Sequence, residues 1–88
     1  MEQLLRPVDV IALWDVDGKI RPLRLQVQSD SGPQRMEVLQ ILQEKQETRY
    51  GWEGTQFLCI VRVGHIQSLV TLFYSQRHRC WSLSGGAA

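Results

Sequence analysis

The stretch from Phe57 to Tyr74 reads FLCIVRV, GHIQS and LVTLFY, and it decides the fold. Its first and last parts are rich in β-branched and aromatic residues, which suit the pleated surface of a strand. Gly64 and the polar Gln67 and Ser68 indicate a turn between them. The stretch therefore predicts a β-hairpin in which Phe57–Val63 and Leu69–Tyr74 are direct neighbours.

Both faces of this predicted hairpin are apolar. With a turn centred near His65 and Ile66, Val61 would lie opposite Val70. One face then carries Phe57, Cys59, Val61, Val63, Val70, Leu72 and Tyr74, and the other carries Leu58, Ile60, Leu69, Thr71 and Phe73. A hairpin with one solvated face should instead alternate between apolar and polar residues. We therefore expect the second face to be covered by the rest of the chain or by a second copy of the protein.

The composition sets limits on the architecture and on the partners. A chain of 88 residues with 43% hydrophobic residues suits one domain with one modest core, which we place at residues 1–83 with a disordered tail at 84–88. The net charge of +1 gives no overall attraction to nucleic acid or to an anionic membrane. All nine acidic residues lie at or before Glu53, so the C-terminal third is locally basic.

Targeting signals are missing from the sequence as given. No run approaches the roughly 20 apolar residues of a transmembrane helix, and the N-terminal MEQLLRPVDV lacks the regions of a signal peptide. Two cysteines are too few for a secreted disulfide scaffold, so we expect free thiols and a cytoplasmic protein with no membrane contact.

The N-terminal part predicts two more strands. Val8–Trp14 is a strand, and Asp15–Gly18 (DVDG) is a turn, because Asp can bond its own backbone and Gly supplies a positive φ. Ile20–Gln28 alternates between apolar and polar residues as a half-buried strand does. Pro22 cannot donate a ladder hydrogen bond, so this strand, or its start, should lie at a sheet edge.

The segment Arg35–Thr48 (RMEVLQILQEKQET) is ambiguous. Its Glu, Gln, Leu and Lys residues favour helix, and Met36, Leu39 and Leu42 fall on one helical stripe. The alternative is a strand with a bulge near Leu39 and Gln40. After it, Arg49–Gln56 reads as a loop, and Arg79–Leu83 as a closing strand that places Trp81 in the core.

The order IRPLRL, MEVLQIL, FLCIVRV and LFYSQRHRCWSL resembles small uncharacterised β-rich proteins of clostridia-like Firmicutes. More distantly, it resembles an uncharacterised domain attached to actinobacterial lesion-bypass polymerase relatives. The likeness spans roughly Val8 to Leu83, and its matched positions are Pro22, Leu23, Val38, Leu39, Phe57, Cys59, Leu72, Tyr74, Trp81 and Leu83. The resemblance implies that Arg35–Glu47 is extended, and it implies no activity. One departure is that Gln76, Arg77 and His78 stand where the family has a Gly or small turn before the closing Trp.

With this resemblance, the sequence predicts an all-β fold. We expect a small antiparallel sheet of five or six strands, curled into a partial barrel. The alternative is an α+β fold in which Met36–Gln46 is a helix packed on the sheet.

Catalytic and metal chemistry find little support. The ligand-type residues Cys59, His65, His78 and Cys80 match no zinc-site spacing. Both histidines lie in predicted turns without a nucleophile beside them, and no Gly-rich phosphate loop is present. We therefore expect no enzyme activity, no catalytic residues, no metal and no cofactor.

Two kinds of interaction remain. The apolar second face of the hairpin predicts a protein-interaction module that self-associates as a homodimer. The alternative is an accessory nucleic-acid-binding small barrel, with Arg62, Arg77, Arg79 and Trp52 as the contact residues. A continuous Arg stripe flanked by exposed rings would favour nucleic acid, and a flat apolar patch would favour protein.

Overall fold

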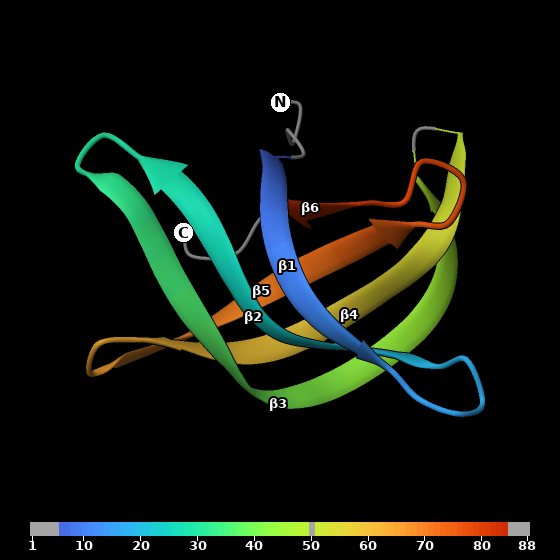
Figure 1. Cartoon of the computed structure of the whole chain (residues 1–88), viewed down its shortest axis with the longest axis horizontal. Coiled ribbons are helices and arrows are strands. Elements are labelled where there is room, and N and C mark those ends of the chain that lie inside the picture. The colour runs from blue at the N-terminus through green and yellow to red at the C-terminus, as the bar shows by residue number, and fades with distance from the viewer. Residues whose placement is uncertain (1–5, 50, 85–88) are drawn as a thin grey trace.

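The computed structural model describes residues 6–49 and 51–84, which form six antiparallel strands joined by short turns. The strands are β1 (Arg6–Trp14), β2 (Ile20–Ser29), β3 (Gly32–Arg49), β4 (Trp52–Val63), β5 (Ile66–Ser75) and β6 (Cys80–Ser84). Each strand pairs with its neighbour in sequence, and β6 pairs with β1, so the sheet closes into a barrel (Figure 1). The β1–β2, β3–β4 and β5–β6 turns lie at one end of the barrel, on the right in Figure 1, and the other two turns lie at the opposite end.

The all-β prediction is confirmed, but the barrel is closed and not partial. Closure depends on the first residues of β1, where Arg6, Pro7 and Val8 pair with Leu83, Ser82 and Trp81 of β6. The sequence predicts this strand only from Val8, because Arg6 and Pro7 carry no strand signal of their own. A strand that starts two residues earlier reaches far enough to pair along β6.

The segment that was ambiguous in the sequence is the long strand β3, so the helical alternative for Met36–Gln46 is wrong. β3 pairs with β2 from Gly32 to Glu37 and with β4 from Glu37 to Arg49, and this pairing outweighs the weak intrinsic preference of the segment for helix. The register shifts between Val38 and Gln40 and again between Ile41 and Gln43. The predicted bulge at Leu39 is therefore present, and a second bulge follows at Leu42.

Two predicted boundaries in the C-terminal half are wrong. The segment Arg49–Gln56 is not a loop, because β4 begins at Trp52 and pairs with β3 from Arg49↔Trp52 onward. Ser84 is the last residue of β6 and is buried, so it does not belong to a tail; residues 85–88 lie outside the described residues.

The central hairpin is present, with a register shifted by two residues from the predicted one. Its turn is Gly64–His65, so Val61 pairs with Ser68, and Cys59 with Val70. Gly64 has a φ of 60°, which matches the turn type that takes Gly at the first position of a two-residue loop. Because the shift is even, every side chain keeps its predicted face.

The barrel interior is filled by the first face of this hairpin and by the closing strand. The core cluster consists of Leu25, Val27, Phe57, Cys59, Val61, Val70, Leu72, Tyr74, Trp81 and Leu83. The prediction that Trp81 is a core residue is confirmed, with 7% of its surface exposed. Its cross-strand partner in β5 is Tyr74.

The two ends of the interior differ in side-chain size. At the aromatic end, the Trp81 ring lies 4.9 Å from that of Tyr74 and 5.8 Å from that of Phe57, measured between ring centroids. Trp14 meets the edge of the Tyr74 ring at 6.2 Å. At the opposite, valine end, the inward side chains include Val27, Val61 and Val70.

The barrel has an open seam between β2 and β3. These strands pair only from Arg24↔Glu37 to Ser29↔Gly32. Beyond that point, in the described residues, Ile20–Pro22 pairs with β1 alone and Val38–Arg49 with β4 alone. Pro22 therefore lies in a part of β2 that has one neighbour, as its missing N–H predicts.

Candidate interaction surface

The residues proposed for nucleic-acid contact are only partly brought together. Trp52 begins β4, and Arg77 and Arg79 lie in the β5–β6 turn beside it. The Trp52 ring stacks on His78 of this turn, with 4.0 Å between ring centroids and 38° between ring planes. The sequence did not identify His78 as a partner of Trp52, because 26 residues separate them and no local pattern links them.

The β5–β6 turn is held in place by Ser75. The main-chain N–H of Arg79 donates to the Ser75 carbonyl at 2.8 Å, and that of His78 donates to Ser75 Oγ at 3.2 Å. Arg79 has a φ of 54°, in the left-handed region that costs a residue with a Cβ about 1 kcal/mol or more. The turn therefore presents its basic residues in a fixed and slightly strained conformation.

Acidic groups border this basic turn. Gln76 lines a groove of about 330 Å³ together with Glu47, Glu53 and neighbouring residues at the ends of β3 and β4. The Gln76 N–H also donates to the Glu53 carbonyl at 3.3 Å. A polyanion at the turn would thus approach two carboxylates as well as the arginines.

Arg62, the fourth residue proposed for nucleic-acid contact, lies away from the others. It is ten residues from Trp52 along β4, roughly 33 Å of extended chain, and its guanidinium forms an ion pair with Glu37 of β3. The predicted residues therefore do not form one continuous basic surface.

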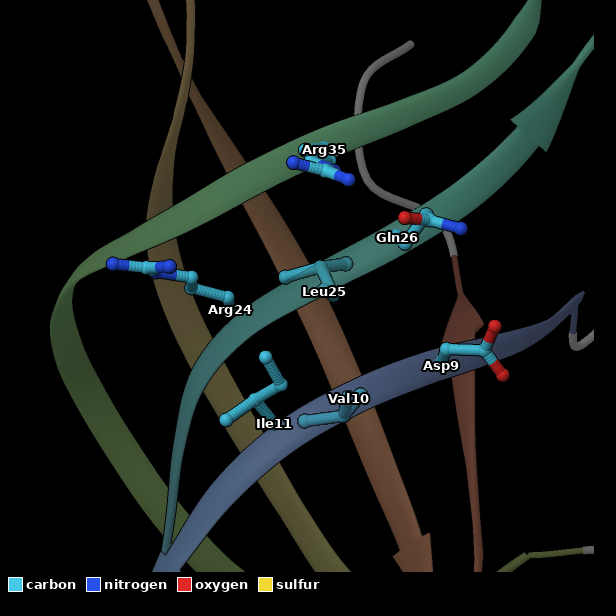
Figure 2. Close-up of a pocket in the computed structure, with 7 residues that line it drawn as sticks. All are labelled: Asp9, Val10, Ile11, Arg24, Leu25, Gln26 and Arg35. Carbon is cyan, nitrogen blue, oxygen red and sulfur yellow. The ribbon is translucent and has the colours of Figure 1, made fainter.

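A shallow groove over β1, β2 and β3 contains two further arginines, which no sequence pattern indicated as contact residues. Figure 2 shows Arg24 and Arg35 on the β3 side of this groove and Asp9 on the β1 side. The groove has a volume of about 380 Å³, and its lining includes Ile11 but no aromatic ring. This groove differs from those that bind single-stranded nucleic acid, because its charge is mixed and no aromatic ring is among these lining residues.

Several apolar side chains lie on the outer surface of β3, β4 and β5, where Gln40 pairs with Ile60 and Gln43 with Leu58. We define the β3–β5 face by the side chains of Leu39, Leu42, Leu58, Ile60 and Leu69. Leu69 is 51% exposed, Leu42 46% and Leu39 40%, and the half-buried Ile60 pairs directly with Leu69. The second face of the hairpin is thus left without a cover over much of its area, because β3 pairs beside β4 and does not fold across it.

The exposure of Leu39 and Leu42 follows from the two bulges. Neither residue has a partner in the β3–β4 register, so the strict alternation that would bury one of every two side chains is broken. A helical stripe through Met36, Leu39 and Leu42 would have buried all three. The signal that could have identified this apolar surface was therefore the bulge, which the sequence suggested only for Leu39.

The reactive side chains of the described residues are scattered. Cys59 is fully buried, burial raises the pKa of its thiol from 9.0 to about 11, and Cys80 is exposed. Among residues 6–49 and 51–84, no three His, Cys, Asp or Glu side chains gather in a way that could hold a metal ion. Over the same residues, no helix is long and apolar enough to span a membrane.

Comparisons with protein-family models, with curated proteins and with solved structures find no match to this chain. The resemblance described from the sequence therefore stays a prediction. The surfaces of the barrel are therefore the basis for inferring its function.

Proposed function

We propose that this protein is a non-enzymatic interaction module that self-associates through the β3–β5 face. The observation that carries the proposal is the exposure of Leu39, Leu42 and Leu69 on the outside of a barrel whose core cluster lies inside the ring of strands. Burying apolar surface stabilises an association by about 25 cal/mol per Å². Loss of freedom and side-chain ordering offset part of this gain.

A second copy of the chain suits this face for two reasons. The ion pair of Arg62 with Glu37 lies on the same outer side of β3 and β4, so a two-fold arrangement would let Arg62 of one copy meet Glu37 of the other. The net charge of +1 gives little repulsion between copies.

The free edge of β3 borders this face and adds to the proposed interface. From Val38 onward, this strand has β4 on one side and no described strand on the other. Unpaired main-chain N–H and C=O groups at such an edge can pair with another chain. The bulges at Leu39 and Leu42 limit this pairing, so we assign the main contribution to the apolar side chains.

Sedimentation equilibrium on the unmodified protein tests self-association directly. We expect a species of twice the chain mass at tens of micromolar, and we expect Leu69→Asp to shift it to a monomer while the far-UV spectrum stays that of a β protein. Ile66→Asp is the matched control, because Ile66 is 68% exposed but has the opposite phase in β5 and lies at the turn. A single species near 10.2 kDa for the unmodified protein would refute the proposal.

Binding of single-stranded nucleic acid is a second candidate, favoured by the stacked Trp52–His78 pair beside Arg77 and Arg79. It predicts that a fluorescent oligothymidylate binds at low salt, that affinity falls steeply as salt rises, and that Trp52→Ala weakens binding. Arg24→Gln is the control outside the turn. Equally weak binding by the unmodified protein, Trp52→Ala and Arg24→Gln would exclude this site.

A further inference from the structure

A cavity of about 260 Å³ opens at the valine end of the barrel, within the ring of strands. Every one of the six strands contributes to its lining, so it is the mouth of the barrel and not a fold in its outer surface. Its lining residues are Arg6, Val27, Ser29, Gln34, Met36, Val61, Val63, Ser68, Val70 and Leu83.

The sizes of the inward side chains explain why this end is hollow. A closed barrel needs side chains large enough to fill its interior along the whole length. The aromatic end provides Phe57, Tyr74 and Trp81, whereas β5 turns only Val70 and Ser68 inward at the valine end. Small side chains facing one another across the mouth leave space that the aromatic residues fill at the other end.

The chemistry of the lining is polarised. Valines together with Met36 and Leu83 make an apolar wall, while Ser29, Gln34 and Ser68 add polar groups. Arg6 is the single charged residue among the lining residues, and no carboxylate accompanies it. One Arg6 N–H donates to the Gln28 carbonyl at 3.3 Å, which holds the guanidinium beside the mouth and uses one of its five donors.

We propose that this cavity binds a medium-chain monocarboxylate, with the alkyl chain against the valine wall and the carboxylate on Arg6. Barrel mouths with apolar walls and a few polar groups are common ligand sites. The cavity volume lies just below the roughly 300 Å³ at which small-molecule sites usually begin, so the site suits a single chain of medium length and not a membrane lipid. This site is separate from the β3–β5 face and does not depend on self-association.

Octanoate is the probe, and the methyl group of Met36 in protein labelled with ¹³C-methyl methionine is the reporter. We expect the Met36 methyl signal to shift in a saturable way as octanoate is added. Affinity should rise about fourfold for each methylene between butanoate and octanoate, and should stop rising once the cavity is full. Octanol and octylamine, which have the same chain without a carboxylate, should bind at least tenfold more weakly.

Two variants separate the head-group contact from the wall. Arg6→Gln should weaken octanoate binding by roughly tenfold or more while octanol binding stays the same. Arg21→Gln is the matched control, because Arg21 is exposed on β2 outside the cavity lining. Ser68→Phe should fill the mouth and abolish binding of every chain length, with folding checked by the far-UV circular dichroism spectrum.

Three results would overturn the proposal. The first is no shift of the Met36 methyl signal at millimolar octanoate. The second is equal binding of octanoate, octanol and octylamine. The third is a loss of affinity in Arg21→Gln as large as in Arg6→Gln, which would mean that overall charge and not the mouth attracts the ligand.

Discussion

At the scale of the residue, the three tryptophans have three different environments. Trp81 is 7% exposed and contacts Phe57 and Tyr74, Trp52 is 37% exposed and stacks on His78, and Trp14 is 53% exposed against the edge of Tyr74. The phase of Trp81 with Leu83 predicted its burial. No local pattern predicted the partners of the other two, because those partners come from distant strands.

Replacing Trp81 by Ala should lower the free energy of unfolding by about 3–5 kcal/mol, because it leaves a large cavity at the aromatic end. Trp52→Ala removes a ring that is largely outside the core and should cost about 1 kcal/mol or less. Denaturant melts of both variants make the comparison. Equal losses would place Trp52 in the core or Trp81 on the surface, contrary to the structure.

The two cysteines should differ sharply in reactivity. Below pH 9.0 in the folded protein, we expect a thiol reagent to modify the exposed Cys80 quickly and the buried Cys59 only as the protein unfolds. The Cys80→Ser variant should show the slow phase alone. Two equally fast phases in the unmodified protein would contradict the burial of Cys59.

The same thiol gives a pH dependence of stability. The pKa of Cys59 is about 11 in the folded protein against 9.0 for an ordinary thiol, so the folded state disfavours the thiolate. The contribution of the buried neutral thiol to stability is complete below pH 9.0 and is lost as pH rises towards 11. Denaturant melts at several pH values, on the Cys80→Ser variant with and without Cys59→Val, measure how much of the pH-dependent loss of stability comes from Cys59.

At the scale of the element, the start of β4 depends on Gly54. An added Cβ at this position would lie 2.0 Å from the Tyr74 carbonyl oxygen and 2.8 Å from the Phe73 ring. Gly54 is therefore required by the close approach of β5 and not by an unusual φ. Phe73 covers the bare main chain of this glycine, which accounts for a fully buried ring on the outer side of the barrel.

Gly54→Ala should therefore destabilise the protein by about 3 kcal/mol or more, because main-chain atoms would have to move. Gly64→Ala is the matched control: its Cβ meets nothing within 4 Å, and only the positive φ of Gly64 opposes it, at a cost of about 1–2 kcal/mol. Thermal and denaturant melts of the two variants test the difference. A milder effect at Gly54 than at Gly64 would show that β4 and β5 are farther apart than described.

At the scale of the whole molecule, the barrel is closed by β1 and β6 but has an open seam beside β3. Among the described residues, Gly32–Met36 pairs with β2 alone and Val38–Arg49 with β4 alone, while Glu37 has a partner on each side. Amide exchange should therefore be uneven along both parts of β3, with fast exchange at the residues whose N–H points away from the paired strand. Amide exchange should be measured on the Leu69→Asp variant, in which self-association should be absent. Uniform protection along the whole of β3 in that variant would mean that the seam is covered.

The sequence alone determined the strand class of most segments and the inward face of the hairpin. The alternation of side chains in Phe57–Val63 and Leu69–Tyr74 predicted the inward face correctly although the predicted register was wrong by two residues. This is because residues two apart in a strand lie on the same face. Local turn chemistry also predicted the Asp15 turn, where Asp15 Oδ1 accepts from the N–H groups of Asp17 and Lys19 at 2.9 Å each.

Only the tertiary structure decided the state of β3, the closure of the barrel and the surfaces that remain exposed. The residues of Arg35–Thr48 prefer helix locally, and it is pairing with β4, a contact distant in sequence, that makes them a strand. Closure needs Arg6 and Pro7 beside β6, and neither residue carries a strand signal. Likewise, the β3–β5 face and the hollow valine end arise from which side chains meet across the barrel, and no single segment contains that information.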